Sequence, residues 1–207
     1  MNTNVYVDGF NLYYGAVKGT PYKWLDIYKL CALMFPKHSL NRIRYFTALI
    51  NPTARDTGKR DRQLTYIRAL KTTPNLTVTK GSFMTNKRRM PLVSPLPDGT
   101  DSVMVLYTEE KGSDVNLAAY LIYDACNHDY KQAIIISNDT DLVEAIGIVR
   151  YSFGLHVVVV NPRRRTAWPL RDVATSYRYI RKGVLSASQF LPVLHDAYGT
   201  IKKPLSW

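Results

Sequence analysis

The sequence predicts an α/β fold with a mainly parallel central sheet, and three observations support this class. Short apolar runs typical of strands alternate with longer segments of helical periodicity. Proline residues end the helical patterns, so the segments are well separated. The chain has 207 residues, 46% of them hydrophobic, which is enough to bury the core of one main domain.

The first half of the chain contains three predicted strands and two predicted helices. Residues 5–8, 43–49 and 76–83 have the composition of strands. Apolar residues recur with helical spacing over 24–34, until Pro36, and a second helix is expected over 55–70. This order of elements is typical of parallel strands joined by helical crossovers.

The segment 85–102 interrupts this alternation. It holds three prolines and a glycine, so we expect a long projecting loop or a hairpin tip. After it we expect a strand over 103–107 and then a helix capped by Ser113. Two further strands are expected at 133–136 and 155–160, and a helix that begins at Asp139 lies between them. We therefore predict one domain over 1–182, with a tail over 183–207 that packs on it.

Composition and charge narrow the classes of partner. The formal net charge is +12, from 28 Lys and Arg against 16 Asp and Glu, which favours a polyanionic ligand. No apolar run approaches the length of a membrane helix, and the N-terminus lacks a signal-peptide pattern, so we expect a cytoplasmic protein that does not bind membranes. Cys31 and Cys126 belong to no paired motif, and we expect both to be reduced core residues.

Four aspartates stand where an apolar run gives way to a helical segment: Asp8, Asp114, Asp139 and Asp141. In a parallel sheet, ligands bind beyond the carboxyl ends of the strands, where Asp8 and Asp139 are expected, and Asp114 can join them from a helix N-terminus. Two carboxylates about 4 Å apart repel by roughly 4 kcal/mol at an effective dielectric of 20. A hard divalent cation, Mg²⁺ or Mn²⁺, would offset this repulsion, so the pattern predicts a metal site.

A structural alternative applies to each aspartate taken singly. Aspartate is a favoured helix N-cap and is stabilised by the helix dipole in a first turn. Capping does not, however, require an acid at the end of the first strand, as Asp8 is, or a second acid two residues after Asp139. The complete set therefore favours a cation site.

Three motifs at these positions resemble those of the NYN domain family, a branch of the PIN-like nucleases with LabA-like bacterial members. They are Val7-Asp8-Gly9-Phe10-Asn11-Leu12-Tyr13, Glu110-Lys111-Gly112-Ser113-Asp114-Val115-Asn116-Leu117-Ala118 and Ser137-Asn138-Asp139-Thr140-Asp141-Leu142. The family commonly has Gly where this chain has Asn138, and Asn tolerates the left-handed conformation that such a Gly would adopt.

The resemblance implies a three-layer α/β/α PIN-like fold and metal-dependent hydrolysis of RNA. It matches Asp8, Asp114, Asp139 and Asp141 to the acidic positions of the family and Asn11 to its motif asparagine. Lys111 is a further candidate, as a fixed positive charge for the transition state, although a solvated lysine before a glycine turn explains it nearly as well. Glu110 is expected either to reach the metal through water or to lie on the surface.

Two basic clusters are candidates for RNA contact. Lys87, Arg88 and Arg89 lie in the predicted projecting segment, whereas Arg163, Arg164 and Arg165 follow a predicted strand, with Trp168 close behind as a possible base-stacking residue. A run of charge is often only a solvated surface. Here the strong positive excess surrounds a predicted acidic pocket, which favours contact with RNA.

The main hypothesis is thus a metal-dependent ribonuclease, and two alternatives from other classes stay open. One is a catalytically silent RNA-binding or regulatory module of the same fold. The other, a DxD-type phosphatase or glycosyltransferase, is disfavoured because Gly9 and Phe10 follow Asp8 where a second aspartate would be needed. The four histidines show no metal-ligand spacing, and no P-loop or nucleophile elbow is present. The sequence does not define the RNA target, activity on DNA, or a protein partner, whether a second copy or a cognate regulator.

Overall fold

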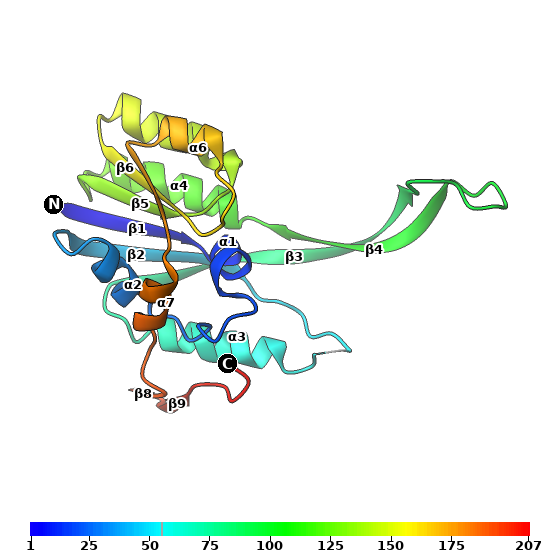
Figure 1. The fold of residues 1–207 in the computed structure, drawn as a ribbon, viewed down its shortest axis with the longest axis horizontal. Coiled ribbons are helices and arrows are strands. Elements are labelled where there is room, and N and C mark those ends of the chain that lie inside the picture. The colour runs from blue at the N-terminus through cyan, green and yellow to red at the C-terminus, as the bar shows by residue number, and fades with distance from the viewer. Residues whose placement is uncertain (55) are drawn as a thin grey trace.

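The computed structural model describes residues 1–54 and 56–207. Its centre is a seven-stranded sheet in the order β4-β3-β2-β1-β5-β6-β7 (Figure 1). Neighbouring strands are parallel, apart from the antiparallel pair β3–β4. The strands are β1 (Asn2–Asp8), β2 (Ser39–Ala48), β3 (Leu76–Pro91), β4 (Ser102–Lys111), β5 (Gln132–Ile136), β6 (His156–Asn161) and β7 (Ser176–Tyr179).

Helices cover both faces of the sheet and give three layers. One face packs against α1 (Gly9–Leu12), the π-helical turn η1 (Tyr13–Val17), α2 (Ile27–Met34) and α7 (Lys182–Ala187). The other packs against α4 (Ser113–Cys126), α5 (Val143–Gly147), the π-helical turn η3 (Ile148–Ser152) and α6 (Trp168–Val173). In β1, Val5 and Val7 join the first core and Tyr6 joins the second, as the alternation of strand side chains requires. The predicted three-layer α/β/α class is confirmed.

The order of the strands creates a topological switch point between β1 and β5. From β1 the chain builds β2 and β3 on one side, and it then returns through α4 to build β5, β6 and β7 on the other side. The two crossovers leave a crevice beyond the carboxyl ends of β1 and β5, because their connections diverge there. Asp8 ends β1 and Asp139 follows β5, so the fold brings both residues to this crevice.

Strands β3 and β4 continue beyond the sheet as a two-stranded antiparallel ribbon. Their pairing runs from Ser82 with Lys111 to Pro91 with Ser102, and the ribbon projects far from the body of the molecule (Figure 1). The expectation of a projecting loop or hairpin tip over 85–102 agrees with the structure at 92–101, which connect the two strands, and was wrong for a loop at 85–91, which continue β3. Strand β3 reaches Pro91, and Pro91 is compatible with a strand because it lies at the last pair of this narrow ribbon.

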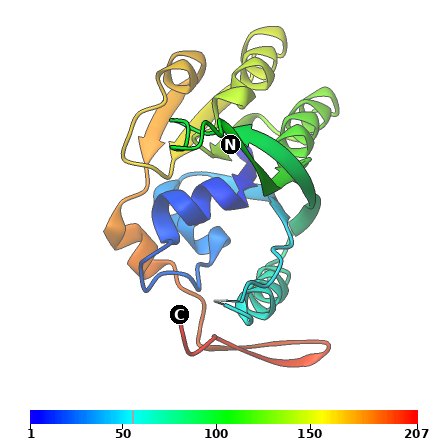
Figure 2. The same ribbon diagram turned by 90° about the vertical axis from the view of Figure 1, so that its right-hand side faces the viewer.

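The C-terminal segment wraps around α3 (Lys59–Leu70) and closes a third, small core. Hairpin β8 (Val193–Asp196) and β9 (Gly199–Lys202) is tied to α3 by two hydrogen bonds from Arg68 to Asp196, of 2.7 and 2.6 Å. Trp207 packs against Trp24 and Tyr66, with ring centroids 6.2 and 5.9 Å apart. Figure 2 shows the C-terminal hairpin (red) next to α3 (cyan). Strands β7, β8 and β9 were not expected from the sequence.

Several local expectations are corrected by the structure. Helix α3 begins at Lys59, and its predicted start at Arg55 lies outside the described residues. Ser113 does not cap α4, because it is the first helical residue and its hydroxyl donates to Glu110 instead. Cys31 is buried as expected, but Cys126 is exposed. None of the described helices is long and apolar enough to cross a membrane.

Candidate metal centre

Asp8 is the buried member of the site. It is the last residue of β1 and the N-cap of α1, with 3% of its surface exposed. Its carboxylate accepts hydrogen bonds from the backbone N–H of Asn11 (2.9 Å), from Asn11 Nδ2 (2.8 Å) and from Ser137 Oγ (2.9 Å). These three donors fix the carboxylate in the crevice and offset part of the cost of its burial.

Asp139 lies opposite Asp8, in the connection after β5. Its backbone N–H donates to Ser137 Oγ (3.0 Å), and its Oδ1 accepts from the backbone N–H of Asp141 (3.0 Å), which caps the short 3₁₀ turn η2 (Thr140–Leu142). The capping role weighed from the sequence is therefore present. It is compatible with metal binding, because a carboxylate has acceptor positions to spare.

Asp114 reaches the crevice from the first turn of α4. The helix starts directly after Gly112, whose φ of 95° lies in the left-handed region that a residue with a side chain rarely adopts. A close approach of β3 supports the turn, since a Cβ on Gly81 would meet Lys111 O and Glu110 Oε1 at 2.4 Å. These two glycines place the N-terminus of α4 at the sheet edge, with Asp114 directed at Asp8.

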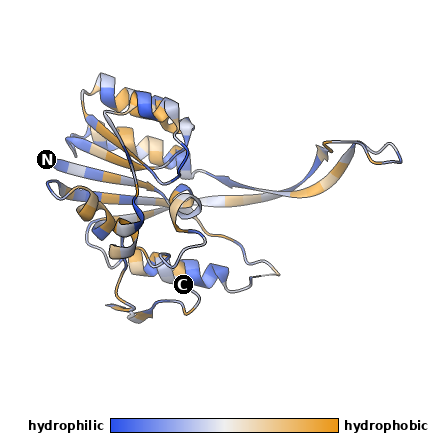
Figure 3. Cartoon of the chain, in the orientation of Figure 1, coloured by the Kyte–Doolittle hydropathy of each residue, from blue (hydrophilic) through white to orange (hydrophobic). Residues whose placement is uncertain are grey.

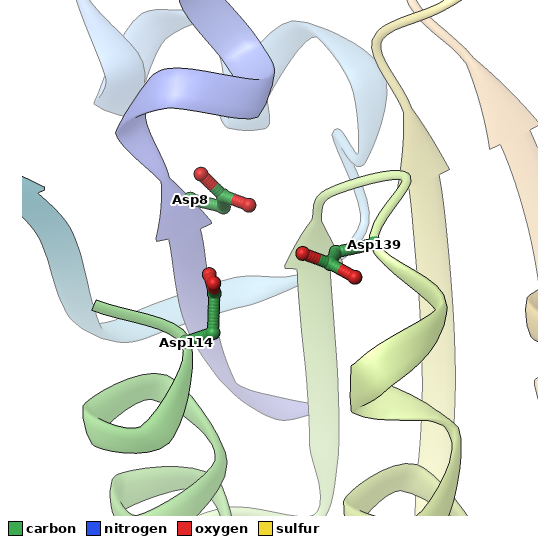
Figure 4. A group of neighbouring side chains, drawn as sticks. All are labelled: Asp8, Asp114 and Asp139. Carbon is green, nitrogen blue, oxygen red and sulfur yellow. The ribbon is translucent and has the colours of Figure 1, made fainter. Parts of the chain in front are cut away.

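The three carboxylates meet at one point. Asp8, Asp114 and Asp139 each offer an oxygen atom, and these oxygens all lie within 4.8 Å of one another. Figure 4 shows the side chains converging from β1, from α4 and from the turn after β5. Ligand oxygens about 2.1 Å from a Mg²⁺ ion in octahedral geometry would be about 3 to 4 Å apart. The three groups therefore fit a hard divalent cation after small side-chain adjustments.

Burial and mutual repulsion raise the affinity of the site for protons. Desolvation raises the pKa of Asp8, and the charge of Asp139 adds to this, against the hydrogen bonds from Asn11 and Ser137. The pKa of Asp114 is raised to about 6, first by burial and then by the charges of Asp8, Asp139, Glu110 and Asp141. Raised carboxylate pKa values in a crevice mark negative charge that lacks a counter-ion.

Comparison with known proteins agrees with this geometry. The family model described as the NYN domain matches residues 2–181, which contain all seven strands of the central sheet and every helix that covers it except α7. The chain belongs to the NYN domain family. The family resemblance drawn from the three sequence motifs is therefore confirmed.

Two further proteins are similar to this NYN chain. The 6-hydroxy-3-succinoylpyridine 3-monooxygenase HspA of Pseudomonas putida (strain DSM 28022 / S16) is 30% identical over 240 aligned positions, which cover 100% of this chain and 75% of that protein. A crystal structure of a protein of unknown function from Vibrio parahaemolyticus RIMD 2210633 superposes with a TM-score of 0.55 at 17% identity. The match covers 87% of this chain and 93% of that one. The second likeness concerns the fold alone.

The structure separates the predicted site residues of this NYN domain into two groups. Asp8, Asp114 and Asp139 come together. The side chain of Asn11 donates a hydrogen bond to the carboxylate of Asp8 and so belongs to the support of this acid. Asp141 is exposed on η2 and lies outside the three-acid group, although its charge contributes to the raised pKa of Asp114.

The lysine and glutamate beside Asp114 have other partners. Lys111 Nζ lies 2.9 Å from Glu109 Oε2, and this is its one ion pair in the described part of the chain. Glu110 Oε1 accepts from the backbone N–H and the hydroxyl of Ser113, so it stabilises the start of α4. Within this geometry, the surface interpretation of Lys111 accounts for its contacts.

Ser137 is the functional residue that sequence reasoning missed. It is fully buried and links two of the acids, as donor to Asp8 and acceptor from Asp139. A serine directly after a buried strand and two residues before an acid was the available signal. The structure also corrects the explanation given for Asn138, which has no positive φ, unlike Asn75 and His128 among the described residues.

The two basic clusters lie on different parts of the molecule. Lys87, Arg88 and Arg89 are exposed on the β3 edge of the ribbon, and the guanidinium of Arg88 lies 5.3 Å from the ring centroid of Tyr107. Figure 3 shows the ribbon as a mixture of hydrophilic and hydrophobic residues with no covering layer.

The second cluster, 163–165, follows β6 and is also exposed. Its first side chain touches the segment after α1, since a Cβ on Gly15 would lie 2.9 Å from Arg163 Cγ. Trp168 begins α6 with 61% of its surface exposed, and the guanidinium of Arg171 lies 5.0 Å from its ring centroid. These positions leave the charged groups and the indole accessible to a ligand.

Proposed function

We propose that this protein is a metal-dependent ribonuclease that hydrolyses phosphodiester bonds of RNA. The observation that carries the proposal is the meeting of Asp8, Asp114 and Asp139 at the switch point of an NYN domain. A nuclease fold, a crevice with unbalanced negative charge and a net charge of +12 for the whole chain are three properties that suit metal-dependent cleavage of a polyanion.

In this proposal the three carboxylates hold Mg²⁺ or Mn²⁺. A bound cation would supply a water molecule of lowered pKa and positive charge for the attacked phosphate. Asn11 and Ser137 orient Asp8 and favour its ionised form, against the effect of burial, because each donates to its carboxylate. Asp141 adds negative charge at the rim, outside the ligand group, and Lys111 is a weaker candidate for contact with the phosphate.

The RNA would be held mainly by cationic side chains outside the crevice. The ribbon presents Lys87, Arg88 and Arg89, and the loop 163–165 presents three further arginines beside η1. Phosphate contacts of this kind fix position without reading sequence. Trp168, exposed near the second cluster, would stack on an unpaired base.

Two other functions are set against this proposal. A silent RNA-binding module of the same fold would bind RNA without turnover, and the complete three-acid group argues for an enzyme instead. The second candidate is an oxygenase, favoured by the monooxygenase to which the chain is 30% identical over its full length. The ligand chemistry argues against it, since three carboxylates without His or Cys suit Mg²⁺ or Mn²⁺ better than iron or copper.

One panel of reactions separates the three functions. End-labelled single-stranded RNA, hairpin RNA and DNA are incubated with the protein in Mg²⁺, Mn²⁺ or chelator, and oxygen uptake is followed separately with 6-hydroxy-3-succinoylpyridine and NADH. The proposal expects RNA cleavage that requires the metal and no substrate-dependent oxygen uptake. RNA binding without cleavage in either metal would establish the silent module, and oxygen uptake with ring hydroxylation would establish the oxygenase.

A further inference from the structure

A cavity lined by α1 lies beside the candidate metal centre. It has a volume of about 390 Å³ and is enclosed by α1 and η1, the end of β2, the first half of α3 and the C-terminal residues Ser206 and Trp207. This volume is at the lower end of the range for small-molecule sites, so it suits a ligand the size of one nucleotide.

The cavity and the metal centre share a wall. Gly9 lines the cavity and directly follows Asp8, the buried acid. The ring of Tyr45 fills the space where a side chain on Gly9 would stand, with Cζ and the hydroxyl oxygen 2.7 Å from the position of such a Cβ. The charge of Asp8 contributes to a raised pKa of Tyr45, after burial. A ligand in the cavity would therefore lie next to the cation site, because Gly9 of the cavity wall directly follows Asp8.

Aromatic and cationic side chains make up much of the cavity wall. Phe10, Tyr13, Tyr14 and Trp207 supply accessible ring surface, and all four are at least partly exposed. Aromatic side chains of this kind stack on a planar ring.

The charges on the rim are mainly positive. Lys18, Lys23 and Lys59 line the cavity and form no ion pair within the described residues, whereas Arg62 pairs with Asp56. Within the described part of the chain, these three cations thus have no carboxylate partner, and Lys18 Nζ lies 4.8 Å from the centroid of the Tyr14 ring. Such a rim favours a ligand with a negative group.

One polar group of the cavity wall is available to a ligand independently of the charges. Tyr45 lines the cavity with only 6% of its surface exposed, and its hydroxyl forms no hydrogen bond with any described residue. The neighbouring polar groups are satisfied, since Gln63 bonds to Ala48 O and to the backbone N–H of Ile50, and the Tyr66 hydroxyl bonds to Leu25 O. Because the Tyr45 hydroxyl borders the cavity and has no protein partner among the described residues, it is available to donate to or accept from a ligand there.

We propose that this cavity binds a planar aromatic ring that carries an anionic group. The ring would lie between the tyrosines of α1–η1 and Trp207, the Tyr45 hydroxyl would donate to or accept from a ring heteroatom, and the free lysines would hold the anion. Two sources share this chemistry: an unstacked nucleotide of an RNA strand that enters the metal centre, and a free heteroaromatic acid. The nucleotide source rests on the proposed ribonuclease function, whereas the cavity itself does not.

Calorimetric titration of the full chain in chelator tests the cavity without any cleavage. AMP, UMP and the pyridine carboxylate nicotinate are titrated separately at low salt into wild type, Tyr45→Phe, Lys59→Ala and the control Lys131→Ala, which alters an exposed lysine at the opposite end of the sheet. Saturable binding of at least one probe is expected. Tyr45→Phe would weaken it by about three- to tenfold, the value of one hydrogen bond. Lys59→Ala would weaken it in a salt-dependent manner, and Lys131→Ala would leave it unchanged.

The outcomes separate this proposal from the ribonuclease. Tighter binding of a nucleotide than of nicotinate identifies the strand as the source, and the reverse identifies a free aromatic acid. The proposal is overturned if no probe binds below millimolar concentration, or if binding is the same in Tyr45→Phe and Lys59→Ala as in wild type. Because no probe is a phosphodiester and no metal is present, neither result depends on whether the protein cleaves RNA.

Discussion

Replacement of Asp139 by Asn should make the metal-free protein more stable. The oxygens of the three acids lie within 4.8 Å of one another, so each pair repels by about 3.5 kcal/mol at an effective dielectric of 20. Asp139 takes part in two of the three pairs, but it is half-exposed, and screening by water and salt reduces the net gain to about 1 kcal/mol. For a chain of this size, that corresponds to a rise of roughly 2 to 4 °C in melting temperature. Asparagine retains the oxygen that caps η2, so the turn is preserved.

The same substitution should remove the response to metal. At a Mn²⁺ concentration 100 times its Kd, binding to the native state adds about 2.7 kcal/mol, or roughly 5 to 11 °C for wild type. Thermal melts at pH 7.5, with chelator and with Mn²⁺, measure both effects, and Asp172→Asn controls for the change in net charge at an exposed acid far from the site. If Asp139→Asn melts like wild type in chelator, and Mn²⁺ shifts neither protein, the residue is only a cap and the electrostatic argument is wrong.

Three further predictions follow from other parts of the structure. Replacement of Lys87, Arg88 and Arg89 together by alanine should weaken RNA binding and reduce the slope of log affinity against log salt concentration by up to about three units. Titration with RNA at several salt concentrations measures this slope, and an unchanged slope would move the contact to the loop 163–165. The affinity for Mn²⁺ should fall below pH 6, because protons compete at Asp114, whose pKa is about 6. Because the folded protein binds this proton more tightly than the unfolded chain does, the metal-free protein should lose stability as pH rises from about 4, the ordinary carboxyl pKa, to about 6. A calorimetric pH series that shows neither trend would refute the raised pKa of Asp114. Ser137→Ala should cost about 1 to 3 kcal/mol in denaturant unfolding and weaken Mn²⁺ binding, and unchanged Mn²⁺ affinity would make the serine purely structural.

The sequence predicted the parts of the site that depend on local pattern. Asp8 and Asp139 each follow a short apolar run, and parallel strands place such residues at one edge, so their meeting could be expected before the structure was known. The position of Asp114 required the glycine turn at Gly112, and the motif contained it. Asp141, like Asp139, is an acid shortly after a buried strand, yet the 3₁₀ turn places it outside the three-acid group. Sequence spacing does not determine the direction of a side chain in such a short turn.

Features that rest on contacts between distant segments were not predictable in this way. The ribbon continues through a proline and a basic run, where turn-forming residues suggested a loop, because ten consecutive cross-strand pairs outweigh local propensity. The tail closes a cavity only because Trp207 packs on Trp24 and Tyr66, which are far away in sequence. No local pattern indicates such a contact, and the unpartnered hydroxyl of Tyr45 can be recognised only once the neighbours are known.

The most direct test of the central claim is the rate of RNA cleavage by wild type and by Asp8→Asn in Mn²⁺, with binding of the same labelled RNA measured in parallel. Asp8 is the buried member of the three-acid group. In the proposed function its substitution removes one ligand of the cation and leaves the proposed RNA-binding cations untouched. The account predicts that wild type cleaves only when the metal is present, and that Asp8→Asn binds RNA with nearly wild-type affinity and does not cleave it. Cleavage by Asp8→Asn at the wild-type rate, or cleavage by wild type in chelator, would contradict it.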